Sequence, residues 1–224
     1  MISDSHRFVF VHIPRTGGTS VETALAQFSR DPVHFVARGN TVFPYKHDSA
    51  QALAGRLGAD WGRYLRFSIV RDPWARMLSE YKFFRETGPL LYDGFSPLER
   101  ALTDAARAYD LERWLFTFAD ELSMAQTAYL TDAQGELMVE HVCRTERLAE
   151  DFAAICARLG IRVALPHVNR TEPSRLWSSF TPAAAALVAE RCGEDLRRFG
   201  YRFCDDLVLR APPLSERDTK HNGG

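Results

Sequence analysis

The sequence lacks the features that mark disulfide-bonded and metal-binding proteins. Its 224 residues contain four cysteines, with no CxxC pair and no spacing typical of a zinc site, namely Cys143, Cys156, Cys192 and Cys204. Such sparse usage favours buried thiols in a reducing cytoplasm over a disulfide framework. We therefore expect a cytoplasmic protein that contains no metal ion.

Long apolar runs and an excess of charge of one sign are also missing. No apolar stretch approaches the length of a membrane span, and the first residues, MISDSHR, carry no apolar signal core. The formal net charge of -1 argues against a general nucleic-acid-binding protein, which would be clearly basic. We expect a soluble protein with no integral membrane contact and no nucleic-acid partner; the composition does not specify an oligomeric state.

What the sequence does contain is an alternation of strand and helix patterns. Residues 8–13 (FVFVHI) and 65–70 (LRFSIV) are short runs typical of buried strands in a parallel sheet. A further strand is predicted over 137–143, and the last predicted helix ends at Gly200. Helices are predicted to begin near Gly18, Ser49, Trp74, Leu148 and Thr181. The alternation predicts an α/β fold with a central parallel sheet flanked by helices.

The length of the chain fits one domain, which we expect over residues 1–209. Residues 87–110 form a polar stretch with glycines and prolines and predict a long excursion with one helix near 98–108; we expect the excursion to extend to residue 126. Excursions of that size often line binding sites, so this one is a candidate wall of an acceptor pocket. The tail, residues 210–224, contains two prolines and ends in Gly-Gly, and it is expected to be disordered.

The segment HIPRTGGTS, residues 12–20, joins the first predicted strand to the first predicted helix. A helix N-terminus presents unpaired N–H groups and partial positive charge, and therefore attracts phosphate or sulfate. Gly17 and Gly18 allow the backbone to approach such an anion closely. Side-chain donors come from a guanidinium and three hydroxyls, those of Arg15, Thr16, Thr19 and Ser20. The segment predicts an anion-binding loop at the carboxyl end of a strand.

Two other interpretations of this segment remain open. One is a simple glycine-rich turn in which a threonine caps the helix. The other is a nucleoside-triphosphate loop, but the first glycine and the Gly-Lys pair of GxxxxGK[ST] are missing. The sequence also shows no strand-end acid that would hold magnesium, which disfavours an ATP-dependent phosphotransferase.

A second predicted strand end carries the same kind of chemistry. Arg71 follows the strand over 65–70, and Ser79 lies about two turns into the next predicted helix. Both side chains can reach one anion near the edge of the sheet. The alternative is a salt bridge between Arg71 and Asp72 with a solvated Ser79.

Together, HIPRTGGTS and RDPWARMLSEYKFF resemble the two nucleotide-binding signatures of the sulfotransferases that use 3′-phosphoadenosine 5′-phosphosulfate (PAPS). The resemblance is strongest to the group that includes carbohydrate sulfotransferases, and it extends to residues 144–152, 166–171 and 195–201. It implies a P-loop-like nucleotide-binding sulfotransferase fold and an enzyme of the EC 2.8.2 class. PAPS would be the co-substrate, without a metal ion.

The resemblance also implies a role for each matching residue. Residues 15–20 would hold the 5′-phosphosulfate, Arg71 and Ser79 the 3′-phosphate, and Arg170 and Thr171 would close over the nucleotide. One departure is Arg15, because members usually carry lysine at that position. Arginine keeps the positive charge but contacts oxygens through a planar fork rather than a point charge.

The acceptor hydroxyl must lose a proton during transfer, and a neutral histidine suits this task near pH 7. His47, in YKHDS, is the predicted general base, because similar members place a histidine there; a locally bonded loop histidine is the alternative. Glu22 is the alternative base, and His12, inside a predicted strand, is interpreted as a core residue.

The resemblance implies a carbohydrate or small-molecule acceptor. A lipid headgroup, an antibiotic-like metabolite and a peptide tyrosine are the alternatives. The alternative to an active sulfotransferase is a catalytically impaired module that binds PAPS or its product. It is motivated by the arginine at position 15 and by the presence of two candidate bases, His47 and Glu22.

Overall fold

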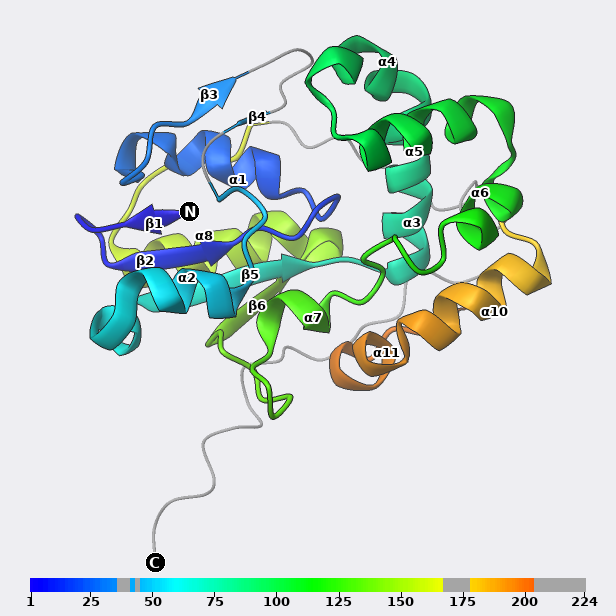
Figure 1. Cartoon of the computed structure of the whole chain (residues 1–224). Coiled ribbons are helices and arrows are strands. Elements are labelled where there is room, and N and C mark those ends of the chain that lie inside the picture. The colour runs from blue at the N-terminus through cyan, green and yellow to red at the C-terminus, as the bar shows by residue number, and fades with distance from the viewer. Residues whose placement is uncertain (36–40, 43–44, 167–177, 204–224) are drawn as a thin grey trace, which may run out of the picture.

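The computed structural model describes residues 1–35, 41–42, 45–166 and 178–203. Its strands are β1 (Ile2–Ser3), β2 (Phe8–Val11), β3 (His34–Phe35), β4 (Thr41–Val42), β5 (Leu65–Val70) and β6 (His141–Arg144). Four of them form a sheet in the order β1-β2-β5-β6, and β3 pairs with β4 (Figure 1). The pairs β2–β5 and β5–β6 are parallel, and only the edge strand β1 is antiparallel to its neighbour within this sheet.

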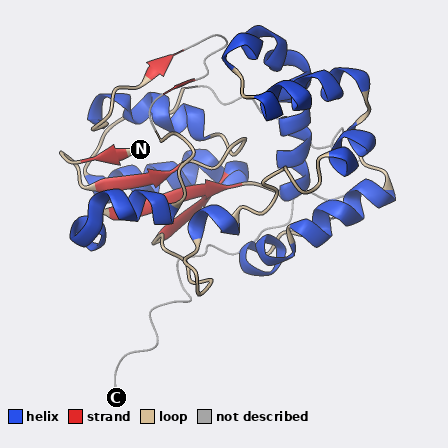
Figure 2. Cartoon of the chain, in the orientation of Figure 1, coloured by secondary structure: helices blue, strands red, loops and turns tan. Residues whose placement is uncertain are grey.

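Helices make up most of the remaining described chain (Figure 2). They are α1 (Gly18–Leu25), α2 (Ala50–Leu57), α3 (Pro73–Lys82), α4 (Gly88–Leu91), α5 (Pro97–Ala108), α6 (Leu111–Thr117), α7 (Thr127–Leu130), α8 (Leu148–Leu159), α10 (Pro182–Arg191) and α11 (Gly193–Phe199). The predicted N-caps are confirmed at two helices. Ser49 Oγ accepts from Ala52 N at 3.2 Å, and Thr181 Oγ1 accepts from Ala184 N at 3.2 Å. No helix in the described parts is long and apolar enough to cross a bilayer.

Alternate residues of the central strands enter two different cores. Phe8 and Phe10 of β2 pack with residues of α1 and α8 on one face of the sheet. Val9 and Val11 pack with residues of α2, α7 and α11 on the other face. All four side chains are fully buried, which explains the continuous apolar run in the sequence. The predicted α/β fold is confirmed, with helices on both faces of a mostly parallel sheet.

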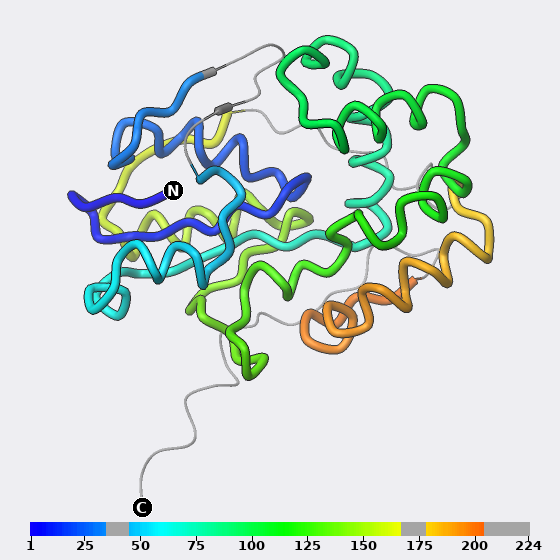
Figure 3. The backbone as a smooth tube through the Cα atoms, in the orientation of Figure 1, coloured from blue at the N-terminus to red at the C-terminus, as the bar shows by residue number. Residues whose placement is uncertain are grey.

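A helical region lies beside the sheet, built on α3 (Figure 3). Its core joins buried residues of α3, α5, α6 and α10, including Trp74 and Trp114. The helix expected near residues 98–108 is confirmed as α5. The expectation of a single helix in the excursion is wrong, because α4 also forms within 87–110, and α6 follows in the part up to residue 126. Packing against α3 stabilises helices whose own sequences are short and interrupted by Gly and Pro.

Two predicted boundaries also differ from the structure. The strand expected over 137–143 begins at His141, because a turn at Asp132 pairs Leu137 with Thr131 instead of with the sheet. The helix expected to run from Thr181 to Gly200 is interrupted at Cys192, which separates α10 from α11. The Cys192 thiol donates to Met124 O at 3.3 Å, and Gly193, a weak helix former, follows it.

Candidate active site

The parallel register brings the ends of β2, β5 and β6 to one edge of the sheet. The loop after β2 turns sharply there, because Arg15 (φ 65°) and Gly17 (φ 87°) both adopt left-handed conformations. Such a conformation is uncommon for arginine, and strained backbone of this kind concentrates at functional sites. Gly17 is the N-cap of α1, and no side chain caps the helix. The first turn of α1 therefore presents backbone N–H groups to this edge.

Gly18 allows the first turn of α1 to lie against the ring of His12. A Cβ at this position would stand 2.2 Å from His12 Cδ2. The ring cannot move aside easily, because it is 3% exposed and its Nδ1 is hydrogen-bonded to Glu22 Oε1. The predicted core role of His12 agrees with this geometry. The glycine is required by packing as well as by any approach of a ligand.

We expect Gly18→Ala to lower the free energy of unfolding by about 1–3 kcal/mol, the usual range for overpacking a filled core. Urea unfolding followed by circular dichroism measures the change. Gly55→Ala is the matched control, since no atom lies within 4 Å of its added Cβ in α2. The control should be neutral or stabilising by up to about 1 kcal/mol, as helix propensity predicts. Equal stability of the two variants would contradict the packing of Gly18.

The three hydroxyl residues of the loop differ in their surroundings. Thr16 is fully buried and its Oγ1 donates to Ile13 O at 2.9 Å, so its hydroxyl hydrogen closes the loop. Thr19 and Ser20 are half-buried in the first turn of α1. Within the described chain, neither hydroxyl of Thr19 and Ser20 is hydrogen-bonded. These two hydroxyls and the adjacent backbone N–H groups remain available to an anion.

Arg71 and Ser79 lie next to this loop. Arg71 Nη1 donates to Arg15 O at 3.0 Å, and Arg15 Nε donates to Ser79 Oγ at 3.2 Å. Two motifs that are far apart in the sequence thus meet at one edge of the sheet. Asp72, which the sequence offered as a salt-bridge partner of Arg71, caps α3, because its Oδ1 accepts from Ala75 N at 2.8 Å.

Thr145 joins the three strand ends and was given no role from the sequence. Its Oγ1 lies 2.6 Å from Thr16 O and 3.2 Å from Val70 O. It follows β6 directly, as Arg71 follows β5, so the strand-end rule that selected Arg71 could have selected it too. Thr145 fixes the glycine turn against the end of β5.

The Arg15 guanidinium lies against α3 in this structure. Besides Ser79, it contacts Glu80, whose Oε2 is 3.8 Å from Arg15 Nε, and the Phe83 ring, whose centroid is 4.7 Å from Arg15 Cζ. The sequence left open whether the aromatics of this region are core or site residues. Trp74, Tyr81 and Phe84 are buried core residues, whereas Phe83 is half-buried and holds the guanidinium.

Positive charges converge on this edge of the sheet. Burial lowers the pKa of Arg15, whose charge is opposed by Glu80 and repelled by Arg76. Burial also lowers the pKa of Arg71 and of Lys46, and in both cases the Arg15 charge adds to the lowering. Partly desolvated cations that repel one another favour the binding of an anion with several charges.

His47 lies beside the loop, in contact with His12. Its Nδ1 is 3.1 Å from His12 O, and the two ring centroids are 4.7 Å apart. A carbonyl oxygen only accepts, so Nδ1 carries the hydrogen and Nε2 of the neutral ring has the free lone pair. Desolvation by neighbouring atoms, followed by the His12 and Lys46 charges, lowers the pKa of His47. The exposed ring is therefore neutral near pH 7.

The alternative base, Glu22, is less accessible. It is fully buried, one carboxylate oxygen is bonded to His12 Nδ1, and the other is 3.9 Å from Lys46 Nζ. A carboxylate held in this way orients His12 and lies behind the loop rather than at its surface.

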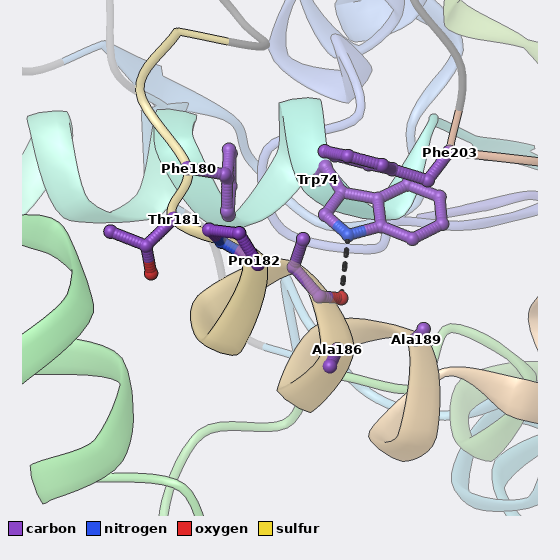
Figure 4. A pocket seen from close by; sticks show the side chains of 8 residues that line it. Trp74, Phe180, Thr181, Pro182, Ala186, Ala189 and Phe203 are labelled. Carbon is purple, nitrogen blue, oxygen red and sulfur yellow. Dashed lines mark hydrogen bonds between the residues drawn. The ribbon is translucent and has the colours of Figure 1, made fainter.

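Two predicted site residues, Arg170 and Thr171, lie outside the described residues. A cavity of about 420 Å³ lies between the start of α3 and α10, where Trp74 Nε1 donates to Ala185 O at 3.0 Å (Figure 4). Its lining is mostly apolar and includes Phe180 and Phe203. None of the predicted site residues in the described chain lines it.

Comparison with known proteins identifies the family. The profile described as "Sulfotransferase family" matches residues 1–202, which include both strand ends and the helical region. Searches of curated proteins and of solved structures gave no match. Because the match spans most of the sequence, the chain belongs to the sulfotransferase family.

Proposed function

We propose that the protein transfers a sulfuryl group from PAPS to an acceptor hydroxyl. The observation that carries the proposal is the meeting of the two motifs, in which Arg15 contacts Ser79 and Arg71 contacts the Arg15 carbonyl. A donor with a phosphosulfate at one end and a phosphate at the other fits two adjacent anion-binding strand ends. Sulfuryl transfer itself is the activity of the family.

Each end of the donor is assigned to one strand end. The 5′-phosphosulfate binds the first turn of α1 and the side chain of Arg15, with donors from Thr19, Ser20 and the backbone of residues 16–18. The 3′-phosphate binds Arg71 and Ser79. Arg170 and Thr171 are proposed to close over the nucleotide.

The acceptor oxygen attacks sulfur as the bond between sulfur and the bridging oxygen breaks. His47 Nε2 takes the acceptor proton, and adenosine 3′,5′-bisphosphate (PAP) leaves with the bond's electron pair. The negative charge on the departing oxygen faces Arg15 and the N-terminus of α1, which stabilise it electrostatically. This scheme needs positioning and charge but no metal ion.

The acceptor is proposed to bind between the sheet edge and the helical region, with residues 87–126 forming its outer wall. Phe83 and Glu80 bring α3 within reach of Arg15, so this region adjoins the position of the transferred group. A carbohydrate is the first acceptor class to test. The support for this class is the resemblance of the two motifs to those of carbohydrate sulfotransferases.

A module that binds the donor without transferring its sulfuryl group is the second candidate. It is favoured by the contacts of Arg15 with Ser79 and Phe83, which hold the guanidinium toward α3. Incubation with PAPS and panels of sugars, small alcohols and tyrosine peptides separates the two. Release of PAP together with an acceptor heavier by one SO₃ unit supports transfer. Tight donor binding without either product supports the module, and failure to bind PAPS at all contradicts both.

The pH dependence of transfer tests the protonation state of His47. A histidine must be neutral to accept a proton, and a lowered pKa extends its neutral form toward acid. A histidine with the usual pKa of about 6.5 is only about one quarter neutral at pH 6.0. We expect the acid limb of kcat/KM to have its midpoint below about pH 6.0. A midpoint at or above about 6.5 would contradict the environment described for His47.

A further inference from the structure

The backbone that carries Arg71 is held by a buried side-chain amide. Gln126, the N-cap residue of α7, is fully buried. Its Oε1 accepts from Arg71 N at 2.8 Å, and its Nε2 donates to Arg71 O at 2.8 Å. A side-chain amide carries such an acceptor and donor pair without a change of protonation state. Gln126 therefore bonds the residue after β5 as a neighbouring strand would.

Asp195 of α11 fixes the orientation of this amide. Asp195 is fully buried, and its Oδ2 accepts from Gln126 N at 2.7 Å and from Gln126 Nε2 at 3.3 Å. Its Oδ1 accepts from Thr127 N at 2.8 Å. Because a carboxylate and a carbonyl both face Nε2, the reversed orientation of the amide would place oxygens against oxygens. The amide has one satisfied arrangement.

The next residue is held from a different part of the chain. Glu146 Oε1 accepts from Asp72 N at 2.8 Å, and Tyr201 OH donates to Glu146 Oε2 at 3.1 Å. Arg71 and Asp72 thus form a short segment whose backbone is bonded by two side chains from other regions, those of Gln126 and Glu146. Leaving one of these buried groups without its partner costs more than a single hydrogen bond contributes. Such a network is more extensive than a simple turn after a strand requires.

We propose that Gln126, oriented by Asp195, is a positioning residue that sets the recognition of the 3′-phosphate through Arg71. This inference depends on the proposed function, which assigns Arg71 to that phosphate. Gln126 itself does not contact the nucleotide. A guanidinium fork recognises phosphate only when its geometry is held within about 0.5 Å and 10–20°. The amide provides this constraint at the backbone of Arg71, through two hydrogen bonds that use none of the guanidinium N–H groups.

The test compares two nucleotides that differ only in the 3′-phosphate, PAP and adenosine 5′-monophosphate. Gln126→Met keeps the length of the side chain and removes both of its hydrogen-bonding groups. The affinity of this variant for PAP should fall about 10-fold, consistent with the loss of one to two hydrogen bonds. The affinity for adenosine 5′-monophosphate should change by less than about 2-fold, because Arg71 does not act on it. Isothermal titration calorimetry measures both constants.

Kinetics provide a second readout that a general loss of structure would not give. The KM for PAPS should rise about 10-fold in Gln126→Met while kcat changes by less than about 3-fold, because the 3′-phosphate is bound equally before and during transfer. Gln134→Met, in an exposed turn, is the matched control and should leave both nucleotide affinities unchanged. If Gln126→Met does not fold, Asp195→Asn is the second variant, because it keeps the shape of the side chain that orients Gln126. It should lower the preference for PAP over adenosine 5′-monophosphate by less than the 10-fold expected for Gln126→Met, about 3-fold.

The outcomes separate this inference from the proposed function. An equal loss of affinity for both nucleotides would show a general structural role and overturn the inference, as would an unchanged preference for PAP. If the wild-type protein does not bind PAP more tightly than adenosine 5′-monophosphate, the proposed function is contradicted, whatever the variants show. If the wild-type protein prefers PAP and the folded variant keeps the same preference, only the role of Gln126 fails.

Discussion

Replacing Arg71 by alanine is expected to weaken the binding of PAP about 100-fold, because a charged hydrogen-bonding fork to phosphate contributes about 1.5–3 kcal/mol. The same substitution should change the affinity for adenosine 5′-monophosphate by less than about 3-fold, since that nucleotide lacks the 3′-phosphate. Titration calorimetry with both nucleotides measures the difference. The loss specific to PAP is the signature of a 3′-phosphate contact.

Two further variants control for the place of Arg71 in the loop. Its Nη1 donates to Arg15 O in the structure, so alanine also removes an anchor of the glycine turn. Arg71→Lys keeps the charge without the fork and should give an intermediate loss for PAP. Arg63→Ala, an exposed arginine before β5, should have no effect. An Arg71→Ala loss that is equal for both nucleotides would contradict the assignment of the 3′-phosphate.

His47→Ala is expected to lower kcat about 100-fold or more, the usual contribution of a general base. Donor affinity should change by less than about 2-fold, because His47 is assigned to the acceptor side of the reaction. Single-turnover measurements of sulfuryl transfer with saturating PAPS give the comparison directly.

A histidine distant from the site is the control for this variant. His141 begins β6 at the opposite end of the strand from Thr145, and His141→Ala should leave kcat unchanged. If His47→Ala turns over at the wild-type rate, His47 is not the base, and Glu22 becomes the leading candidate. Its burial beside His12 would then require the loop to move during the reaction.

The sequence predicted the central strands β2 and β5 well, because its signals there are local and strong. The run from Phe8 to Val11 is apolar on both faces, as a strand covered by helices on each side must be. Helix starts followed from capping chemistry, as at Ser49 and Thr181. The end of α8 followed from Gly160, whose φ of 65° suits a glycine cap.

The helical region was underestimated for an equally physical reason. Residues 87–97 contain Gly88, Pro89, Gly94 and Pro97, which locally indicate turns. Short helices form there nonetheless, because Phe95 packs against the core that Phe84 and Leu102 build with α3. Tertiary packing of this kind overrides local propensity and is not visible in a periodicity pattern.

Site residues at strand ends could be predicted from the sequence. Residues whose side chains hold the backbone of a site residue by hydrogen bonds could not. Arg15 and Arg71 follow buried strands, and the rule that parallel strands end together places them at one edge. Gln126 has no such signal, since its role depends on two backbone groups of Arg71 that only the folded chain brings to it. The contact of Glu80 with Arg15 likewise depends on how α3 leaves the sheet.

A crystal structure of the protein with PAP tests the central claim most directly. We expect the 3′-phosphate to lie within about 3.2 Å of Arg71 and Ser79, a normal hydrogen-bond distance. We expect the 5′-phosphate to lie against the first turn of α1, beside Gly17 and Gly18. A nucleotide bound elsewhere, for example in the cavity beside Trp74, with both strand ends empty, would contradict the central claim.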